Sequence, residues 1–150
     1  MLKKQEWFES EEFWKNYGPI MFDGSHWAEA PGIAEAVCKI AGLSKGCSIL
    51  EAGCGPGRVA VEFALLGLDV TGVDLIQSEL DAAKETADAE NVKLNLIKAD
   101  LRDFTTENKF DCAVNLYTSF GYCESIEDDL KILKRICDSL KDDGFFILEC

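Results

Sequence analysis

A glycine-rich run, Glu51-Ala-Gly-Cys-Gly-Pro-Gly57, is the part of the sequence best suited to holding a ligand. It follows an apolar segment typical of a buried strand and precedes a segment with helical spacing. Glycines at such a turn let the backbone bend sharply and approach a ligand without side chains in between. The run therefore predicts a binding loop between the first strand of a sheet and the helix that follows it.

The spacing of the glycines distinguishes two kinds of binding loop. A dinucleotide loop has the pattern Gly-x-Gly-x-x-Gly, which seats a pyrophosphate at the N-terminus of the helix. Here Gly53, Gly55 and Gly57 alternate, and Arg58 stands where the third dinucleotide glycine would be. Glu51 would also repel a phosphate. A nicotinamide or flavin nucleotide site is therefore the disfavoured interpretation.

Two further acidic residues follow strand-like segments. Asp74 ends the second apolar segment about 20 residues after the glycines, where a carboxylate can accept hydrogen bonds from both hydroxyls of a ribose. Asp100 follows the third such segment, in Lys98-Ala-Asp-Leu101. The alternatives are that Asp74 caps the next helix and that Asp100 is a solvated loop residue.

Together, residues 51–57, 74 and 100 resemble the motifs of the class I S-adenosylmethionine-dependent methyltransferases. The resemblance implies S-adenosylmethionine as the cofactor, with Glu51 at its ammonium, Asp74 at its ribose and Asp100 at its adenine amino group. No metal site is expected, because no Cys/His cluster has a suitable spacing. The expected cofactor-binding residues are Trp14, Tyr17, Glu51, Gly53, Cys54, Gly55, Gly57, Asp74, Leu75, Asp100, Leu101, Asn115 and Leu116.

The expected acceptor pocket follows the fourth strand-like segment, in Asn115-Leu-Tyr-Thr-Ser-Phe-Gly-Tyr122. This form resembles a subgroup of the family that acts on small molecules, which implies methyl transfer to an O, N or C atom of a small acceptor. Such a transfer is an in-line displacement that alignment and desolvation accelerate without a fixed nucleophile. If the acceptor must lose a proton, the candidate catalytic bases are His26, Tyr117 and Tyr122. The alternative for His26 is a surface or packing role.

The elements that must position these residues alternate as in a parallel sheet covered by helices. Strands are predicted at 48–52, 69–74, 92–99, 110–116 and 145–149, and helices at 58–66, 78–89 and 125–140. Ser78 and Ser125 are predicted to cap the last two helices, and residues 141–144 are predicted as a turn. The resemblance implies an α/β fold, a three-layer Rossmann-like sandwich with a mostly parallel sheet in the order 3-2-1-4-5 and helices on both faces.

The N-terminal part of the sequence differs in character, because seven aromatic residues lie between positions 7 and 27. We predict that residues 1–46 form a helical, aromatic lid segment of the same domain, with an amphipathic helix over 33–41. Residues 47–150 would form the cofactor-binding core. Trp14 and Tyr17 would close over the cofactor, since lids exclude water from a reaction. The alternative is that the aromatic side chains only pack on the sheet.

Composition limits the partners of this 150-residue chain. Its formal net charge of -13 and its pI of about 4.4 would repel the phosphates of a nucleic acid, so a small-molecule acceptor is expected. The seven cysteines are odd in number and follow no secretory signal, which favours reduced thiols in a cytoplasmic protein. No membrane segment is expected, because no apolar stretch reaches the roughly 20 residues that cross a bilayer.

Members of the family continue past the fifth strand, whereas this sequence ends at Cys150. We therefore expect either a core truncated after the fifth strand or an exposed sheet edge that pairs with a second copy in a homodimer. Two other functions stay open at this stage. One is a non-catalytic S-adenosylmethionine-binding or dimerisation module with the same fold, and the other is a nucleotide-dependent oxidoreductase.

Overall fold

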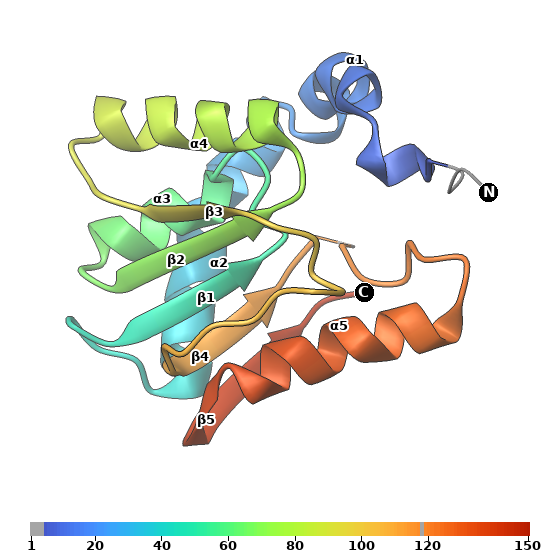
Figure 1. The fold of residues 1–150 in the computed structure, drawn as a ribbon. Helices are drawn as coiled ribbons and strands as arrows, with labels where there is room; N and C mark the ends of the chain where they lie inside the picture. The colour runs from blue at the N-terminus through green and yellow to red at the C-terminus, as the bar shows by residue number, and fades with distance from the viewer. Residues whose placement is uncertain (1–4, 118) are drawn as a thin grey trace.

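Five parallel strands form one sheet at the centre of the computed structural model, which describes residues 5–117 and 119–150. The strands are β1 (Ser48–Ala52), β2 (Asp69–Asp74), β3 (Asn95–Lys98), β4 (Phe110–Asn115) and β5 (Leu140–Leu148). They lie in the order β3-β2-β1-β4-β5, and each neighbouring pair is parallel. The predicted α/β fold and its strand order are thereby confirmed (Figure 1).

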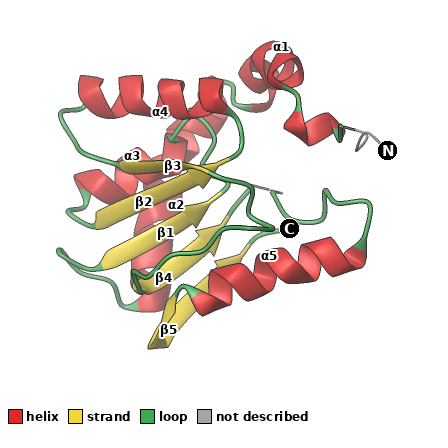
Figure 2. Ribbon diagram, in the orientation of Figure 1, coloured by secondary structure: helices red, strands yellow, loops and turns green. Residues whose placement is uncertain are grey.

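Helices cover both faces of this sheet (Figure 2). They are η1 (Trp7–Glu9, a 3-10 helix), α1 (Glu11–Met21), α2 (Gly24–Ala41), α3 (Arg58–Leu65), α4 (Gln77–Ala89) and α5 (Ile126–Asp138). Helices α2 and α3 pack on one face, and α5 packs on the other. Helix α4 lies beside α3 and contacts β2 and β3. The result is the three-layer Rossmann-like arrangement expected from the sequence.

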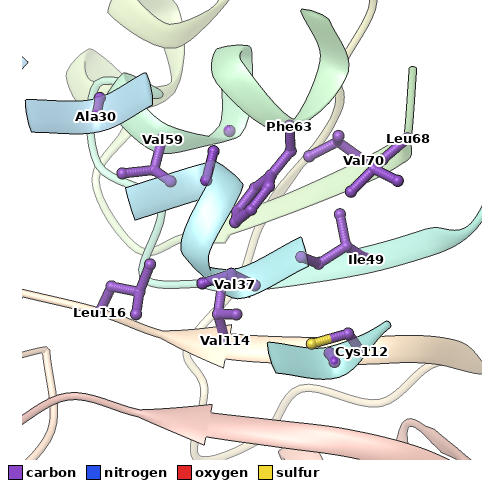
Figure 3. Packing of buried hydrophobic residues seen from close by; sticks show 13 residues of the cluster. Ala30, Val37, Ile49, Val59, Phe63, Leu68, Val70, Cys112, Val114 and Leu116 are labelled. Atoms are coloured by element: carbon purple, nitrogen blue, oxygen red, sulfur yellow. The ribbon is translucent and has the colours of Figure 1, made fainter. Parts of the chain in front are cut away.

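The core consists of two apolar clusters, one on each face of the sheet. Phe63 of α3 is fully buried between α2 and the sheet, near Val37 of α2 and Ile49 of β1 (Figure 3). On the other face, Ile132 and Ile136 of α5 pack against the strands. Each such side chain contributes about 1.5 to 3 kcal/mol when fully buried. The clusters hold the strand ends, and therefore the loops that follow them, in fixed positions.

Helices α2, α4 and α5 begin at caps that only partly match the prediction. Ser125 caps α5 as predicted, because its Oγ accepts a hydrogen bond from the Asp128 amide at 3.1 Å. The predicted cap Ser78 is wrong, since α4 begins at Gln77 and Ser78 lies inside the helix. Helix α2 begins at Gly24 instead of residue 33, because the Asp23 carboxylate accepts hydrogen bonds from the first backbone amides.

The last strand and the third strand also differ from the prediction. Residues 141–144 are not a separate turn but belong to β5, where the ladder shifts register between Phe110 and Cys112 of β4. The Lys141 ammonium holds this irregular stretch to the Asp111 carboxylate at 2.7 Å. Strand β3 is shorter than predicted because it lies at the edge of the sheet and pairs only with β2.

Two sequence expectations concern the helices and the cysteines of the described residues. None of the helices in residues 5–117 and 119–150 combines the length and the apolar character needed to cross a membrane. All seven cysteines are unpaired thiols. Burial raises the pKa of the Cys112 and Cys123 thiols to about 12, so these two side chains behave as small apolar groups rather than nucleophiles.

Candidate functional site

Two adjoining cavities open where the strands end at the carboxyl edge of the sheet. The larger encloses about 750 Å³, part of it open to solvent, and the smaller about 330 Å³. Gly53 and Gly55 line both cavities, together with Phe22 and Ser119. Ligands of open α/β sheets bind at this edge. The loop between β1 and α3 therefore separates two compartments of one candidate site.

The glycine loop is held rigidly over the end of β2. The backbone amides of Gly53 and Cys54 both donate to the Val73 carbonyl, at 2.8 and 3.0 Å. Gly53 has a φ of 75°, and a Cβ there would lie 2.8 Å from the Ser119 Oγ. Gly55 has a φ of 52°, but the space around it is open on the cavity side. A side chain at either position would be strained and would fill space that a ligand can use.

Asp74 lies in the larger cavity at the end of β2. Its two carboxylate oxygens accept one backbone hydrogen bond each, from Gly55 at 2.8 Å and from Ile76 at 3.0 Å. Burial raises the pKa of Asp74, and these two amides oppose that shift. Each oxygen keeps a second lone pair for a ligand. The carboxylate is therefore fixed in orientation and able to accept two hydroxyl groups.

Glu51 lies in the smaller cavity and is almost completely buried. Its Oε2 atom has no hydrogen-bond partner among the described residues. Burial raises the pKa of Glu51 to about 8, an effect that the Arg58 guanidinium reduces and the Asp74 carboxylate increases. A buried acid with an unpaired oxygen is costly, and a cationic ligand would relieve that cost.

Asp100 follows β3 on the wall of the larger cavity, where Arg102 engages both of its carboxylate oxygens. The same guanidinium binds Glu6 at 3.0 Å and Glu9 at 2.6 Å, so it joins the N-terminal segment to the loop after β3. The Asp100 and Glu9 carboxylates raise the pKa of Arg102. Leu101 and, from the loop after β2, Leu75 line the same cavity with apolar side chains.

The aromatic N-terminal segment forms part of the larger cavity. Trp14 lines it, and its Nε1 donates to the Phe8 carbonyl at 2.8 Å. Tyr122, from the loop after β4, also lines it and packs on Trp7, with ring centroids 4.7 Å apart. Tyr17 does not line either cavity, because it stacks on Phe13 and is 52% exposed.

His26 and Tyr117 form a hydrogen-bonded pair beside the smaller cavity. The Tyr117 Oη lies 2.6 Å from the His26 Nε2, and the His26 Nδ1 lies 2.9 Å from the Asp23 carboxylate. Tyr117 has a φ of 54°, unusual for a residue with a side chain. The Arg58 guanidinium lies over its ring, 5.3 Å from the centroid. Tyr117 lines the smaller cavity, whereas His26 lies behind it.

The structure thus brings most of the predicted site residues to one place. Cys54 and Leu116 line the smaller cavity. Gly57 and Asn115 line neither cavity: Gly57 packs on Ala83 of α4, and the buried Asn115 donates its Nδ2 to the Ala52 carbonyl at 3.0 Å. The sequence interpretation did not single out several residues that line the cavities, namely Phe8, Phe22, Arg58, Glu79, Arg102 and Ser119.

Of these missed residues, Glu79 had a detectable signal. It lies in the first turn of the helix after Asp74, five residues further along, where a side chain reaches back toward the strand ends. Phe8 and Arg102 had none, since they reach the cavity through contacts between segments far apart in the sequence.

Comparisons with known proteins agree with this geometry. Residues 49–144 match the family described as methyltransferase domain. A protein of Geobacillus sp. (strain WCH70) named as a methyltransferase is 32% identical over 101 residues, which are 67% of this chain and 41% of that protein. The chain spans about two-fifths of the length of the curated relatives that it matches.

Two solved structures share the fold. An S-adenosylmethionine-dependent methyltransferase from Clostridium acetobutylicum has a TM-score of 0.74 and 22% identity, covering 90% of this chain and 55% of that one. An amino pentose methyltransferase from Micromonospora echinaspora, solved with S-adenosylmethionine bound, has a TM-score of 0.72 and 23% identity, covering 84% and 51%.

Proposed function

Because the chain belongs to the methyltransferase domain family, we propose that it binds S-adenosylmethionine and transfers the methyl group to a small molecule. The observation that carries this proposal is the pair of cavities that meet at the glycine loop, one containing Asp74 and the other Glu51. The amino pentose methyltransferase with the same fold is named as a structure with that cofactor bound, which supports the choice.

The larger cavity suits the adenosine part of the cofactor. Asp74 would accept the ribose hydroxyls, since its two oxygens are oriented by backbone amides and keep free lone pairs. Leu75 and Leu101 would lie against the adenine ring. Asp100 lines the same cavity and would receive the adenine amino group in addition to its hydrogen bonds from Arg102.

The smaller cavity suits the methionine part. Glu51 would receive the ammonium group, which would pair the oxygen that has no protein partner and favour the ionised carboxyl. The Arg58 guanidinium lines the same cavity and could hold a carboxylate. The residues present therefore fit a ligand that carries an ammonium at one end and an adenosine at the other.

When bound, S-adenosylmethionine supplies a methyl group that the positive sulfur has already activated for displacement. The chain's own contribution is to orient the ligand, to exclude water and to hold an acceptor in line. Phe22 and Tyr122 wall the cavities with aromatic surface. For an acceptor that must lose a proton, we propose Tyr122, or Tyr117 with its hydrogen-bonded partner His26, as the base.

We further propose that residues 1–46 act as a lid on the core formed by residues 47–150. Within this segment α2 packs in the core, whereas the part before it, residues 5–23, is held by polar contacts that include those of Arg102 and of the Tyr117 hydroxyl, which donates to the Met21 carbonyl at 3.1 Å. We also propose that the free side of β5, at the edge of the sheet, pairs with a second copy of the chain. The net charge of -13 supports a small acceptor over a nucleic acid, and the unpaired cysteines support a cytoplasmic location.

Calorimetric titration of S-adenosylmethionine, S-adenosylhomocysteine and NADH tests the cofactor assignment. We expect micromolar binding of the first two and none of NADH. The Asp74→Ala variant should weaken binding by roughly 10- to 100-fold, the usual effect of losing a charged hydrogen-bond acceptor. Asp69→Ala is the matched control, since Asp69 is exposed at the other end of the same strand. Binding of NADH alone would refute the proposal.

The rival function is a non-catalytic module that binds the same cofactor. It differs from the enzyme in one measurable respect, which is formation of S-adenosylhomocysteine. Incubating the chain with labelled cofactor and a panel of small amines, phenols and acidic carbon compounds separates the two. Binding without acceptor-dependent turnover across the panel would favour the module.

A further inference from the structure

Glu79 presents an unpaired carboxyl group to the larger cavity. It lies in the first turn of α4 and lines that cavity. Its Oε1 is 3.5 Å from the position of a Cβ on Gly18 of α1, and its Oε2 is 3.6 Å from that of a Cβ on Gly55. The carboxyl therefore lies between the N-terminal segment and the glycine loop. Within residues 5–117 and 119–150, no hydrogen bond or ion pair involves it.

The groups that face Glu79 are acidic or neutral, and the acidic ones already accept hydrogen bonds from the protein. Asp74, at the end of β2, holds two backbone amides. Glu11 of α1 accepts hydrogen bonds from the backbone amide of Gln77 and from the hydroxyl of Ser78. The Cys54 thiol stays neutral, because burial raises its pKa well above the usual range. None of these groups offers a positive charge to Glu79.

Among residues 5–117 and 119–150, two cations near this region interact with other carboxylates. Arg102 lines the same cavity but is bound by Asp100, Glu6 and Glu9. Lys15 of α1 attracts the Glu11 carboxylate and contributes to the lowering of its pKa. Burial, followed by the Asp74 and Glu11 charges, raises the pKa of Glu79 to about 7. The cavity therefore contains a carboxyl whose charge a bound cation would stabilise.

We propose that Glu79 makes the site sensitive to the charge on the cofactor's sulfur, so that ionised Glu79 favours cationic S-adenosylmethionine over neutral S-adenosylhomocysteine. This inference rests on the proposed function, since it concerns the ligand of the same site. The two ligands differ only in the transferred methyl and the charge that accompanies it. Gly55, on which a Cβ would lie 3.6 Å from the Glu79 Oε2, lines both cavities, so the sulfur that joins the adenosine and methionine parts would lie beside this carboxyl. A carboxylate there attracts the cation and gives no charge attraction to the neutral product. Loss of the methyl would thus remove an attraction and assist product release.

The proton balance of this step is simple. Glu79 begins largely protonated below pH 7, and binding of the cation favours its ionised form. The proton goes to solvent. S-adenosylhomocysteine should release fewer protons, because it lacks the sulfonium. Both ligands carry the same ammonium group, so both cause Glu51 to release the same number of protons. This contribution cancels when the protons released by the two ligands are subtracted.

Calorimetry of the 150-residue chain tests this inference. Protons released at pH 7 are obtained by titrating S-adenosylmethionine and S-adenosylhomocysteine in phosphate and in Tris, which differ in ionisation enthalpy. We also expect the affinity ratio of the first ligand to the second to rise roughly fivefold between pH 6 and pH 8.5, as for one partly screened charge pair. In Glu79→Gln, the pH dependence of this ratio and the difference in released protons should both disappear.

The matched control is Glu85→Gln, which makes the same charge change at an exposed position of the same helix. It should behave like the wild type. A wild-type ratio that does not change with pH, or a ratio whose pH dependence persists in Glu79→Gln, would overturn the inference while leaving cofactor binding intact. Failure of the wild type to bind either ligand would instead overturn the proposed function, and this inference with it.

Discussion

Replacing Gly57 by alanine is expected to lower the free energy of unfolding by about 2 to 5 kcal/mol. Gly57 has a φ of 79°, a region where a side chain costs roughly 1 to 2 kcal/mol. A Cβ at this position would also lie 2.8 Å from the Ala83 Cβ and 3.0 Å from its Cα. Because α3 and α4 would have to separate, this overpacking adds about 1 to 3 kcal/mol.

Urea unfolding followed by circular dichroism measures the effect, and a second substitution separates its two causes. Ala83→Gly removes the methyl group that Gly57→Ala would meet. Alone it should cost about 1 to 2 kcal/mol, from lower helix propensity and a lost buried methyl. In the double variant the contact with the Ala83 Cβ is absent and only the 3.0 Å contact with the Cα remains. The combined cost should therefore fall short of the sum of the single costs by about 1 to 2 kcal/mol.

Gly42→Ala is the control for backbone strain alone. Gly42 has a φ of 65°, but no atom lies within 4 Å of a Cβ there. Its substitution should cost only the roughly 1 to 2 kcal/mol of the left-handed conformation. If Gly57→Ala costs no more than Gly42→Ala, or if Ala83→Gly gives no rescue, then α3 and α4 do not depend on close approach at Gly57.

Three further predictions follow from the charged groups. Glu51→Gln should be more stable than the wild type at pH 8.5 by on the order of a few kcal/mol. In the folded chain Glu51 keeps its proton up to a pKa of about 8, whereas in the unfolded chain it loses the proton near pH 4.5. The stability of the wild type should therefore fall between about pH 4.5 and pH 8. Equal urea midpoints of the two proteins at pH 8.5 would contradict this. Glu11→Gln should lower the free energy of unfolding by about 1 kcal/mol, because it weakens the cap of α4. An unchanged urea midpoint would contradict this. Arg102→Gln should lower the free energy of unfolding by about 3 kcal/mol, because Asp100, Glu6 and Glu9 lose their partner. The same variant should be cleaved faster by chymotrypsin in the aromatic N-terminal segment. If its cleavage rate equals that of the wild type, this network does not fix the segment.

The fold was predictable from the sequence where its causes are local. Strands β1 and β2 have the predicted bounds, because each is a short run that is buried in its middle and begins at a polar residue. The Ser125 cap was likewise predictable, since it depends on a hydroxyl and an amide three residues apart. The glycine loop and Asp74 could be placed at one site because parallel strands end at the same edge of a sheet.

The remaining features depend on partners far away in the chain. Helix α4 begins without a side-chain cap of its own because Glu11, 66 residues earlier, accepts hydrogen bonds from its first amides. Arg102 meets Glu6 across 96 residues. Tyr17 was predicted to close over the cofactor, but it stacks on Phe13 and lines neither cavity. No local pattern encodes such contacts, because they depend on how the N-terminal segment docks.

Because the part of this segment before α2 lies outside the core, its helices should open at a lower free energy than the strands of the sheet. Helices η1 and α1 contribute no residue to either apolar cluster, and among their residues only Gly18 is buried. Opening them breaks a few polar contacts, each worth about 0.5 to 3 kcal/mol, and ring contacts such as that of Trp7 with Tyr122, whereas exposing β1 or β4 requires disrupting the core. Amide hydrogen exchange should therefore show residues 11–21 opening as one unit of low free energy, well before the strands, so that ligand entry need not wait for global unfolding.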